Sequence, residues 1–347
     1  MSETLVALEQ EVPPLLKVRL PFPHRLNCFI RLWTLKVLAC IVFAIDRLLY
    51  PRPPALSPTL IKAYPYRPAL QTRVFYPPNY KSEDLLPLYL NIHGGGFALC
   101  DARQDDDFCI MWAKRTGMLI VSLNYSKAPL RPFPTAVYDI AAVAGAVLTD
   151  ASLPVDKNKI VIGGFSAGGN LSLCASQLPP LKGKIRAALT FYPIVDWSYP
   201  PSEKLDSRPY KDGPQDSLKF SSYWYDWGYV CPGQNRRDPL LSPIYAKKED
   251  LPPWIYVIGA EWDLLRLESQ KMINKLAGHG RLENQEDDFE IGTYKWTLAK
   301  RCRHSFTHYF GHNLEKKRKT EEKCRPICEE AIKWLEKALA ESNSPPT

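Results

Sequence analysis

The chain has 347 residues, 45% hydrophobic and 24% charged, which is near the composition of ordinary folded globular proteins. Its formal net charge is +8, but 45 basic residues are scattered among 37 acidic ones, which argues against a nucleic-acid partner. The nine cysteines show neither a regular disulfide spacing nor metal-ligand pairs, and no apolar secretory segment opens the chain. We therefore expect a reducing, cytoplasmic location and no metal.

Residues 1–65 are expected to form an N-terminal arm, because prolines punctuate its second half before the first strand begins. Within the arm, residues 28–50 are mostly apolar and come nearest to a membrane span. Four charged residues interrupt them: Arg31, Lys36, Asp46 and Arg47. Only Val37–Ile45 is free of charge, whereas a span needs about twenty mostly apolar residues. We predict a cap or interfacial helix, with membrane association through residues 28–50 as the alternative to a cytoplasmic protein.

Seven apolar runs, separated by segments of helix length, predict a mostly parallel sheet with helices on both faces. The predicted strands are Thr72–Tyr76, Leu86–Ile92, Met118–Asn124, Ile160–Gly163, Ala187–Tyr192, Trp254–Gly259 and Phe289–Tyr294. A last helix is predicted from Ile327 to about Leu339, where apolar residues recur on one side.

The second of these strands leads directly into His93, Gly94, Gly95, Gly96 and Phe97. Consecutive glycines leave their backbone N–H groups unshielded, so these groups can donate to the negative oxygen that forms when a carbonyl is attacked. A flexible glycine turn is the alternative interpretation. The position between two apolar strands, upstream of a second motif, favours an oxyanion-binding loop.

The fourth predicted strand runs into Gly164, Phe165, Ser166, Ala167 and Gly168, the pattern of a nucleophile elbow. A serine hydroxyl is a poor nucleophile at neutral pH, so it must be held on a tight turn where a base can reach it. The flanking glycines remove Cβ atoms that would collide in such a turn. We expect the N–H of Ala167 to complete the oxyanion hole with those of Gly94, Gly95 and Gly96.

Together, HGGGF at residues 93–97 and GFSAGGN at residues 164–170 resemble the hormone-sensitive-lipase-like branch of the α/β-hydrolases, which contains many carboxylesterases. Further similar segments follow in the family's order, and the resemblance covers about residues 70 to 312. It implies an α/β-hydrolase fold, a mostly parallel central sheet flanked by helices. Residues 66–195 and 251–347 would form the core, and residues 196–250 a cap insertion that joins the N-terminal arm in a helical cap.

The cap insertion is unusually aromatic, and rings over an active site would shape an apolar pocket and exclude water. Our hypothesis is that at least two of Tyr223, Trp224 and Trp227 contact substrate, with Phe97 beside them. Alternatively, these rings pack the core of the cap itself.

The family orders its triad as serine, acid, histidine. Asp263, just past the strand at Trp254–Gly259, falls at the family's acid position, with Glu261 as the fallback. Among six histidines, the resemblance matches His304 to the family's His-Gly-Phe, which makes it the candidate base, with His308 next. His312 is a third candidate by position. The other three lie at positions where we do not expect the base: His24, His93 and His279.

Three departures from the family stand out. Phe165 replaces an aspartate found in many relatives, Ser305 replaces the glycine after the histidine, and the segment from Asp263 to His304 is longer than usual. Neither replacement removes a proton-transfer group. The long segment must still bring His304 to hydrogen-bond distance from Ser166.

The resemblance implies a serine carboxylesterase that hydrolyses short- to medium-chain acyl or acetyl esters of small molecules through an acyl-enzyme, with no cofactor. Two alternatives stay open. One is an acyltransferase or thioesterase on the same triad, and the other is a non-catalytic ligand-binding relative. The oligomeric state is also left open.

Overall fold

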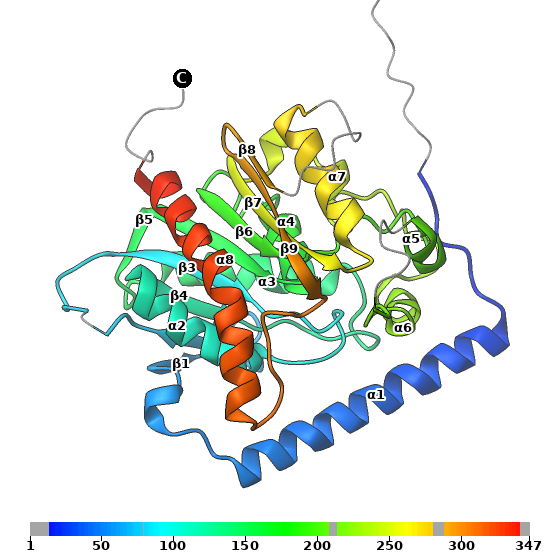
Figure 1. The fold of residues 1–347 in the computed structure, drawn as a ribbon, viewed down its shortest axis with the longest axis horizontal. Helices are drawn as coiled ribbons and strands as arrows, with labels where there is room; N and C mark the ends of the chain where they lie inside the picture. Colours follow the sequence, from blue (N-terminus) through cyan, green and yellow to red (C-terminus); the bar gives the residue numbers. More distant parts are fainter. Residues whose placement is uncertain (1–13, 79, 208–213, 280–287, 341–347) are drawn as a thin grey trace, which may run out of the picture.

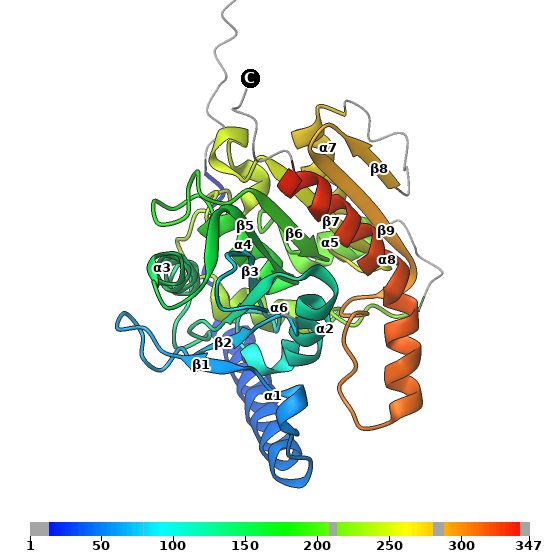
Figure 2. The same cartoon turned by 90° about the vertical axis from the view of Figure 1, so that its left-hand side faces the viewer.

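The structure is a computed structural model that describes residues 14–78, 80–207, 214–279 and 288–340. Its centre is one nine-stranded sheet in the order β1-β2-β4-β3-β5-β6-β7-β9-β8. The strands are β1 Leu60–Lys62, β2 Thr72–Phe75, β3 Leu86–Ile92, β4 Leu119–Leu123, β5 Val155–Phe165, β6 Ala187–Phe191, β7 Trp254–Trp262, β8 Asp288–Ile291 and β9 Tyr294–Arg303. The six strands from β4 to β9 in that order are parallel, and β1, β2 and β8 pair antiparallel at the edges (Figure 2). The predicted mostly parallel sheet is confirmed.

Helices cover both faces of this sheet (Figure 1). On one face lie α3 Thr135–Thr149, α4 Ala167–Ala175 and α7 Arg266–Ala277, and on the other α2 Asp106–Thr116 and α8 Leu314–Ala340. Every residue of β4 and β6 is buried, so these strands present apolar side chains to both faces. A sheet of this kind is stable only with a helical layer on each side.

Three further helices stand outside these layers: α1 Phe22–Leu49, α5 Pro201–Ser207 and α6 Ser221–Tyr229. The arm contacts the insertion directly, through a bridge between Leu16 and Asn235 and an ion pair of 3.2 Å between Lys17 and Asp226. The described part of the chain also contains four short 3-10 turns, at Pro54–Leu56, Ala102–Asp105, Pro243–Tyr245 and Lys248–Asp250.

Two sequence predictions of elements were wrong in detail. The run predicted as one strand at Phe289–Tyr294 contains the end of β8, the hairpin turn at Gly292 with a φ of +57°, and the first residue of β9. The strand that carries the chain onward is β9, whose charged residues obscured its apolar character. The last helix begins at Leu314, well before the predicted Ile327. Its first half is exposed and charged, so it lacks the apolar pattern from which the helix was predicted.

Candidate active site

Three polar side chains follow the carboxyl ends of three parallel strands. Ser166 follows β5, Asp263 follows β7 and His304 follows β9. The carboxyl ends of parallel strands meet at one edge of a sheet, where α/β proteins bind their ligands. The hairpin of β8 and β9 takes up the long segment before His304, so β9 lies beside β7 and delivers the histidine to this edge.

The three side chains form a hydrogen-bonded relay. Nε2 of His304 lies 2.8 Å from Oγ of Ser166, and Nδ1 lies 2.7 Å from Oδ2 of Asp263. The carboxylate is 1% exposed, and its other oxygen accepts the N–H of Leu265 at 3.0 Å. A fixed carboxylate at Nδ1 holds that proton on the ring, which leaves Nε2 free to take the proton of the serine hydroxyl.

The alternative acid and bases have other partners. Glu261 accepts the N–H of Arg301 at 2.6 Å, and His308 Nε2 lies 3.0 Å from Oδ1 of Asp105. His312 pairs with Asp46 at 2.7 Å. None of these contacts joins the side chain to the hydroxyl of Ser166.

The turn that carries Ser166 is as tight as the sequence pattern requires. Ser166 has φ +53° and ψ −115°, a conformation that costs energy for any residue with a side chain. A Cβ at Gly168 would lie 1.9 Å from the carbonyl oxygen of Ile92, so only glycine fits there. Helix α4 begins at Ala167, and the N–H groups of its first turn have no partner inside the helix. They are therefore available to an anion beside Ser166.

The glycine loop is held by hydrogen bonds to its carbonyl groups. The carbonyl of Gly94 accepts the hydroxyl of Tyr125 at 3.1 Å, and that of Gly95 accepts the N–H of Leu99 at 2.8 Å. A trans peptide points its N–H opposite to its C=O, so these bonds fix the direction of the N–H groups of Gly95 and Gly96. Gly94, Gly95 and Gly96 line the same cavity as Ser166. Gly95 has φ +105°, where a residue with a Cβ would be strained.

His93 supports the same loop from beneath. Its ring is fully buried, with Nδ1 2.7 Å from the carbonyl of Gly94 and Nε2 3.0 Å from the amine of Lys127. Burial, with the nearby lysine, lowers the pKa of His93 well below its usual range. A neutral ring can donate from Nδ1 to the Gly94 carbonyl and accept from Lys127 at Nε2, so both nitrogens are used structurally.

Ser305, the departure next to the candidate base, has φ +63°. This is the left-handed region that glycine enters freely, which gives a physical reason for the glycine of the relatives. Phe165, the other departure, is 1% exposed, and its ring meets that of His308 edge-on with centroids 4.5 Å apart.

The relay opens into a cavity of about 270 Å³ that residues of α5 and α6 also line. Phe97 lines it, whereas Tyr223, Trp224 and Trp227 are not among the described residues of its wall. Trp227 instead packs edge-on against Phe29 of α1, and Tyr223 is 40% exposed. The hypothesis that at least two of these three rings contact substrate is therefore not supported by the structure.

Helix α6, which carries Tyr223, Trp224 and Trp227, lines the cavity with other residues. Ser222, Tyr225 and Asp226 of α6 are three and four residues apart, the spacing of one helix face. A Cβ at Gly96 would lie 2.6 Å from the ring of Tyr225, so this ring covers the glycine loop. The spacing of these three residues is visible in the sequence. Aromatic residues occur on more than one face of α6, however, so the sequence does not indicate which face lines the cavity.

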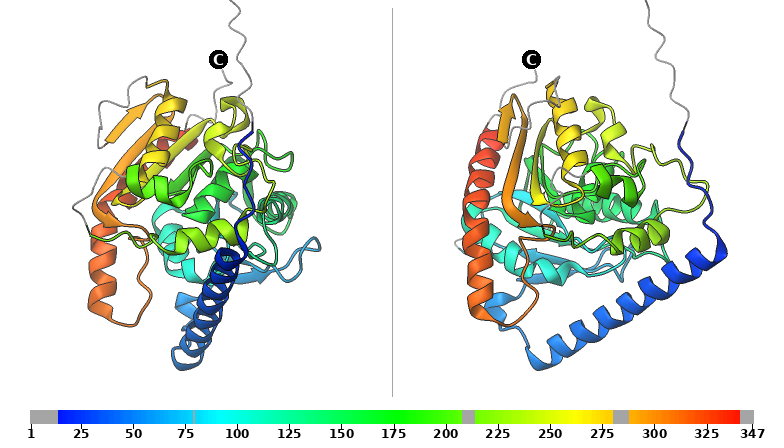
Figure 3. Two further views of the ribbon diagram at one scale, coloured as in Figure 1. Left: turned by 90° about the vertical axis from the view of Figure 1, so that its right-hand side faces the viewer. Right: turned by 45° about the vertical axis from the view of Figure 1, so that its right-hand side comes forward.

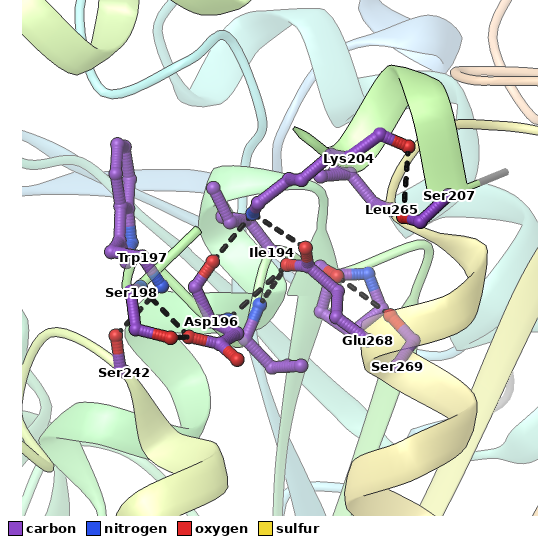
Figure 4. A network of polar contacts seen from close by, with 12 residues as sticks. Ile194, Asp196, Trp197, Ser198, Lys204, Ser207, Ser242, Leu265, Glu268 and Ser269 are labelled. Carbon is purple, nitrogen blue, oxygen red and sulfur yellow. Dashed lines mark hydrogen bonds and ion pairs between the residues drawn. The ribbon is translucent and has the colours of Figure 1, made fainter. Parts of the chain in front are cut away.

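A buried ion pair fastens the cap to the core, and the sequence did not reveal it. Lys204 of α5 lies 2.5 Å from Glu268 of α7, and it also donates to the carbonyl of Asp196 (Figure 4). The carboxylate of Glu268 further accepts the N–H groups of Val195 at 2.9 Å and Asp196 at 3.2 Å. Lys204 also lines the cavity. The pair thus holds the insertion where it leaves the sheet.

We expect Lys204→Met to destabilise the fold by about 3 to 5 kcal/mol at pH 8, because it leaves a buried carboxylate without its counter-charge. Burial already raises the pKa of Glu268 from 4.5 to about 7, with Lys204 opposing the shift. A raised carboxyl pKa favours the folded state at low pH, and that benefit is lost as the pH rises through the folded-state value. The destabilisation should therefore be smaller at pH 6 than at pH 8, measured by urea unfolding.

Two variants provide controls for this prediction. Lys182→Met breaks an exposed pair with Asp250 and should change stability by less than about 1 kcal/mol. The double variant Lys204→Met/Glu268→Leu should recover part of the loss, because no buried charge remains. An equal loss for Lys204→Met at both pH values would contradict the assignment.

Comparison with known proteins gives one family. A model described as the alpha/beta hydrolase fold matches residues 89–286, a range that includes Ser166 and Asp263 but ends before His304. Carboxylesterase NlhH of Mycobacterium tuberculosis is 31% identical over 206 residues, which are 57% of this chain and 62% of that protein. Esterase LipI of the same organism is 28% identical over 214 residues, 60% of this chain and 65% of that protein. The chain thus matches less than two thirds of the length of these relatives.

Solved structures agree on the fold. The thermophilic carboxylesterase EstE1, cloned from a metagenomic library, superposes with a TM-score of 0.67 at 24% identity, covering 89% of this chain and 97% of that one. The hyperthermophilic esterase of Pyrobaculum calidifontis gives 0.65 at 22% identity, covering 91% and 100%. At these identities the likeness concerns the fold.

Proposed function

We propose, from the premise that this chain belongs to the hormone-sensitive-lipase-like branch of the α/β-hydrolase family, that it is a serine carboxylesterase. Ser166 is the nucleophile, His304 the general base and Asp263 the residue that orients the imidazole. The observation that supports this most is the relay itself, with contacts of 2.8 and 2.7 Å from one imidazole to a hydroxyl and a buried carboxylate. The esterase names of the relatives point to the same reaction.

In the first half of the proposed reaction, Oγ of Ser166 attacks the ester carbonyl while Nε2 of His304 takes the hydroxyl proton. The carbonyl oxygen becomes negative and accepts from the backbone N–H groups of Gly94, Gly95, Gly96 and Ala167. The tetrahedral intermediate then expels the alcohol, which receives the proton from His304.

In the second half, a water molecule takes the place of the alcohol. His304 removes a proton from the water, the resulting hydroxide attacks the acyl-enzyme, and the proton returns to Ser166 as the carboxylic acid leaves. Throughout both halves, Asp263 stabilises the imidazolium that forms when His304 holds two protons. No cofactor takes part in this scheme.

The cavity supports a proposal for the substrate class. Its volume of about 270 Å³ and its walls of side chains such as Phe97, Ile194 and Leu264 suit a small apolar acyl group. We therefore propose short- to medium-chain acyl or acetyl esters of small molecules. A non-catalytic ligand-binding role is less well supported, because every group of the relay has its partner in place.

A fluorophosphonate probe tests the proposal, because it phosphonylates a serine only when base and oxyanion hole activate it. The wild-type protein should be labelled at Ser166, and Ser166→Ala should take up no label. A panel of p-nitrophenyl esters from acetate upward should show the fastest turnover at short to medium chains. An unlabelled wild-type protein that hydrolyses none of these esters would rule the esterase out.

The ester assay also distinguishes the esterase from an acyltransferase, which transfers the acyl group to an alcohol, and from a thioesterase, which takes it from a thioester. With a competing alcohol present, product analysis separates hydrolysis from acyl transfer, and a thioester analogue of the best ester separates the thioesterase. We expect the free acid as the main product and the oxygen ester as the better substrate. Predominant transfer to the alcohol would indicate an acyltransferase on the same triad.

A further inference from the structure

Helix α1 is far more exposed than a helix of its composition would be in a protein core. Its 28 residues contain an 18-residue window with a mean hydropathy of 2.1, long and apolar enough to cross a membrane, and only 6% of that window is buried. The helix crosses the outside of the molecule, with no other described element on its outer side (Figure 3). The helix therefore exposes an apolar surface that no described part of the protein covers.

The charges that interrupt this helix in the sequence mostly face the protein. Lys36 donates to the carbonyl groups of Ala98 and Ala128, both at 2.7 Å. Arg47 pairs with Asp101 at 2.6 Å, and Asp46 pairs with His312. Of the four interrupting charges, Arg31 alone has neither an ion pair nor a side-chain hydrogen bond with a described residue. The sequence therefore overestimated how polar the outer side of the helix is.

That outer side is a row of large apolar side chains, here called the α1 row. Its members are each 45% to 80% exposed: Leu26, Ile30, Val37, Leu38, Ile41, Val42, Ile45, Leu48 and Leu49. An apolar surface of this extent on one helix marks a contact with an apolar phase or partner. At about 1.5 Å per residue the helix is about 42 Å long, so the row is a long, narrow strip.

Up to Ile45 the α1 row is bordered by positive charge only, and Asp46 just beyond is paired with His312. Residues 14–45 contain no aspartate or glutamate, and Arg19, Arg25 and Arg31 form no ion pair among the described residues. An apolar strip bordered by arginines is the pattern of a helix that binds anionic lipid. A second copy of the chain would bring the same arginines to the contact, and the one acidic residue of its α1, Asp46, is already paired with His312.

The ends of the helix determine its orientation. Lys17, just before α1, is tied to Asp226 at the end of α6, and Asp46 at the other end is tied to His312. Midway, Leu32 is fully buried against Gly228, where an added Cβ would lie 2.6 Å from its side chain. Crossing a bilayer would break all of these contacts, whereas lying along its surface breaks none.

We propose that α1 lies flat in the headgroup boundary of an anionic membrane, with the α1 row inserted and the hydrolase core in the water. The inference does not depend on the catalytic proposal. It places the cap helix α6, which packs on α1 and carries Tyr225 of the cavity wall, on the side of the protein next to the membrane.

Vesicle sedimentation of the full-length chain tests this proposal. We expect the wild-type protein to sediment with phosphatidylcholine vesicles that contain about one third phosphatidylserine, and to bind vesicles of phosphatidylcholine alone much more weakly. Added salt should release part of the bound protein, because screening weakens the arginine contacts. The variant Val37→Asp/Ile41→Asp should lose at least about tenfold in affinity, because two charges would enter the apolar boundary.

A matched control carries the same charges elsewhere. Leu85→Asp/Tyr138→Asp alters two exposed residues, 69% and 47% accessible, outside α1 and the cap. It should bind vesicles like the wild type, and both double variants should keep wild-type circular dichroism and probe labelling. Equal binding by wild type and the Val37/Ile41 variant, or a wild type that ignores every vesicle, would overturn the proposal.

Two other outcomes would replace it. If the wild type is a dimer that binds no vesicle, and Val37→Asp/Ile41→Asp makes it a monomer, the α1 row is a contact between copies of the chain. If alkaline carbonate fails to release membrane-bound protein, α1 spans the bilayer instead of lying on it. Release by carbonate is the result we expect.

Discussion

Replacing His304 by alanine is expected to lower kcat for p-nitrophenyl acetate by about 10⁶-fold, because Ser166 would lose the base that activates it. Ser166→Ala should cost about as much, and the double variant Ser166→Ala/His304→Ala should be no worse than either single one. Groups that act as a unit in one proton transfer show this non-additivity. Initial rates at saturating substrate, with an active-site titration of the wild type, provide the measurement.

The other histidines supply the controls. His312 lies outside the cavity on an ion pair with Asp46, so His312→Ala should keep the wild-type rate. His308 lines the cavity but bonds to Asp105, so His308→Ala should cost much less than His304→Ala. Should His308→Ala prove the more damaging, the base would be His308, and the relay drawn through His304 would be incorrect.

The sheet could be predicted because its interior strands are continuous apolar runs. Six of the seven predicted strands coincide with strands of the structure, apart from a few terminal residues. Two other strands, β1 at one edge and β9 inside the sheet, were harder to predict. β1 has three residues, two of them exposed, and β9 mixes apolar with charged residues, so neither shows the pattern of a buried strand.

The candidate relay could be predicted because its residues lie in short motifs whose order along the chain is characteristic of the family. Their distances could not, since they depend on how β5, β7 and β9 are arranged in the sheet. The sequence also does not predict in which direction a side chain on a short helix points. Tyr225 faces the cavity and Tyr223 faces solvent, although the sequence offers both as equivalent aromatic residues.

The partners of charged residues were the least predictable. Lys204 and Glu268 meet only when the cap docks on α7, and Lys36 finds its two carbonyl acceptors only in the folded loops below α1. A count of charges in a segment therefore says little about its exposed face. In α1, the number of charged residues suggested that the apolar stretch is interrupted. In the folded protein, the exposed side of the helix is almost continuously apolar.

The second large effect concerns the carboxylate of the relay. Asp263→Asn is expected to lower kcat by about 10⁴-fold with little change in KM, because the shape of the site is kept and the tautomer of the histidine is reversed. The wild-type carboxylate accepts a hydrogen bond from the Nδ1–H group of His304, with Nδ1 2.7 Å away. An amide NH₂ would donate to Nδ1 instead, so Nε2 would carry the ring proton and could not accept from Ser166.

Glu261→Gln is the matched control, since it makes the same chemical change two residues away. Its carboxylate accepts the N–H of Arg301 and does not contact His304, so this variant should keep the wild-type rate. Both variants should unfold at urea concentrations close to that of the wild type. A larger loss of kcat for Glu261→Gln than for Asp263→Asn would assign the orienting role to Glu261. The carboxylate that stabilises the imidazolium in the transition state would then differ from the one that contacts the imidazole in the free enzyme.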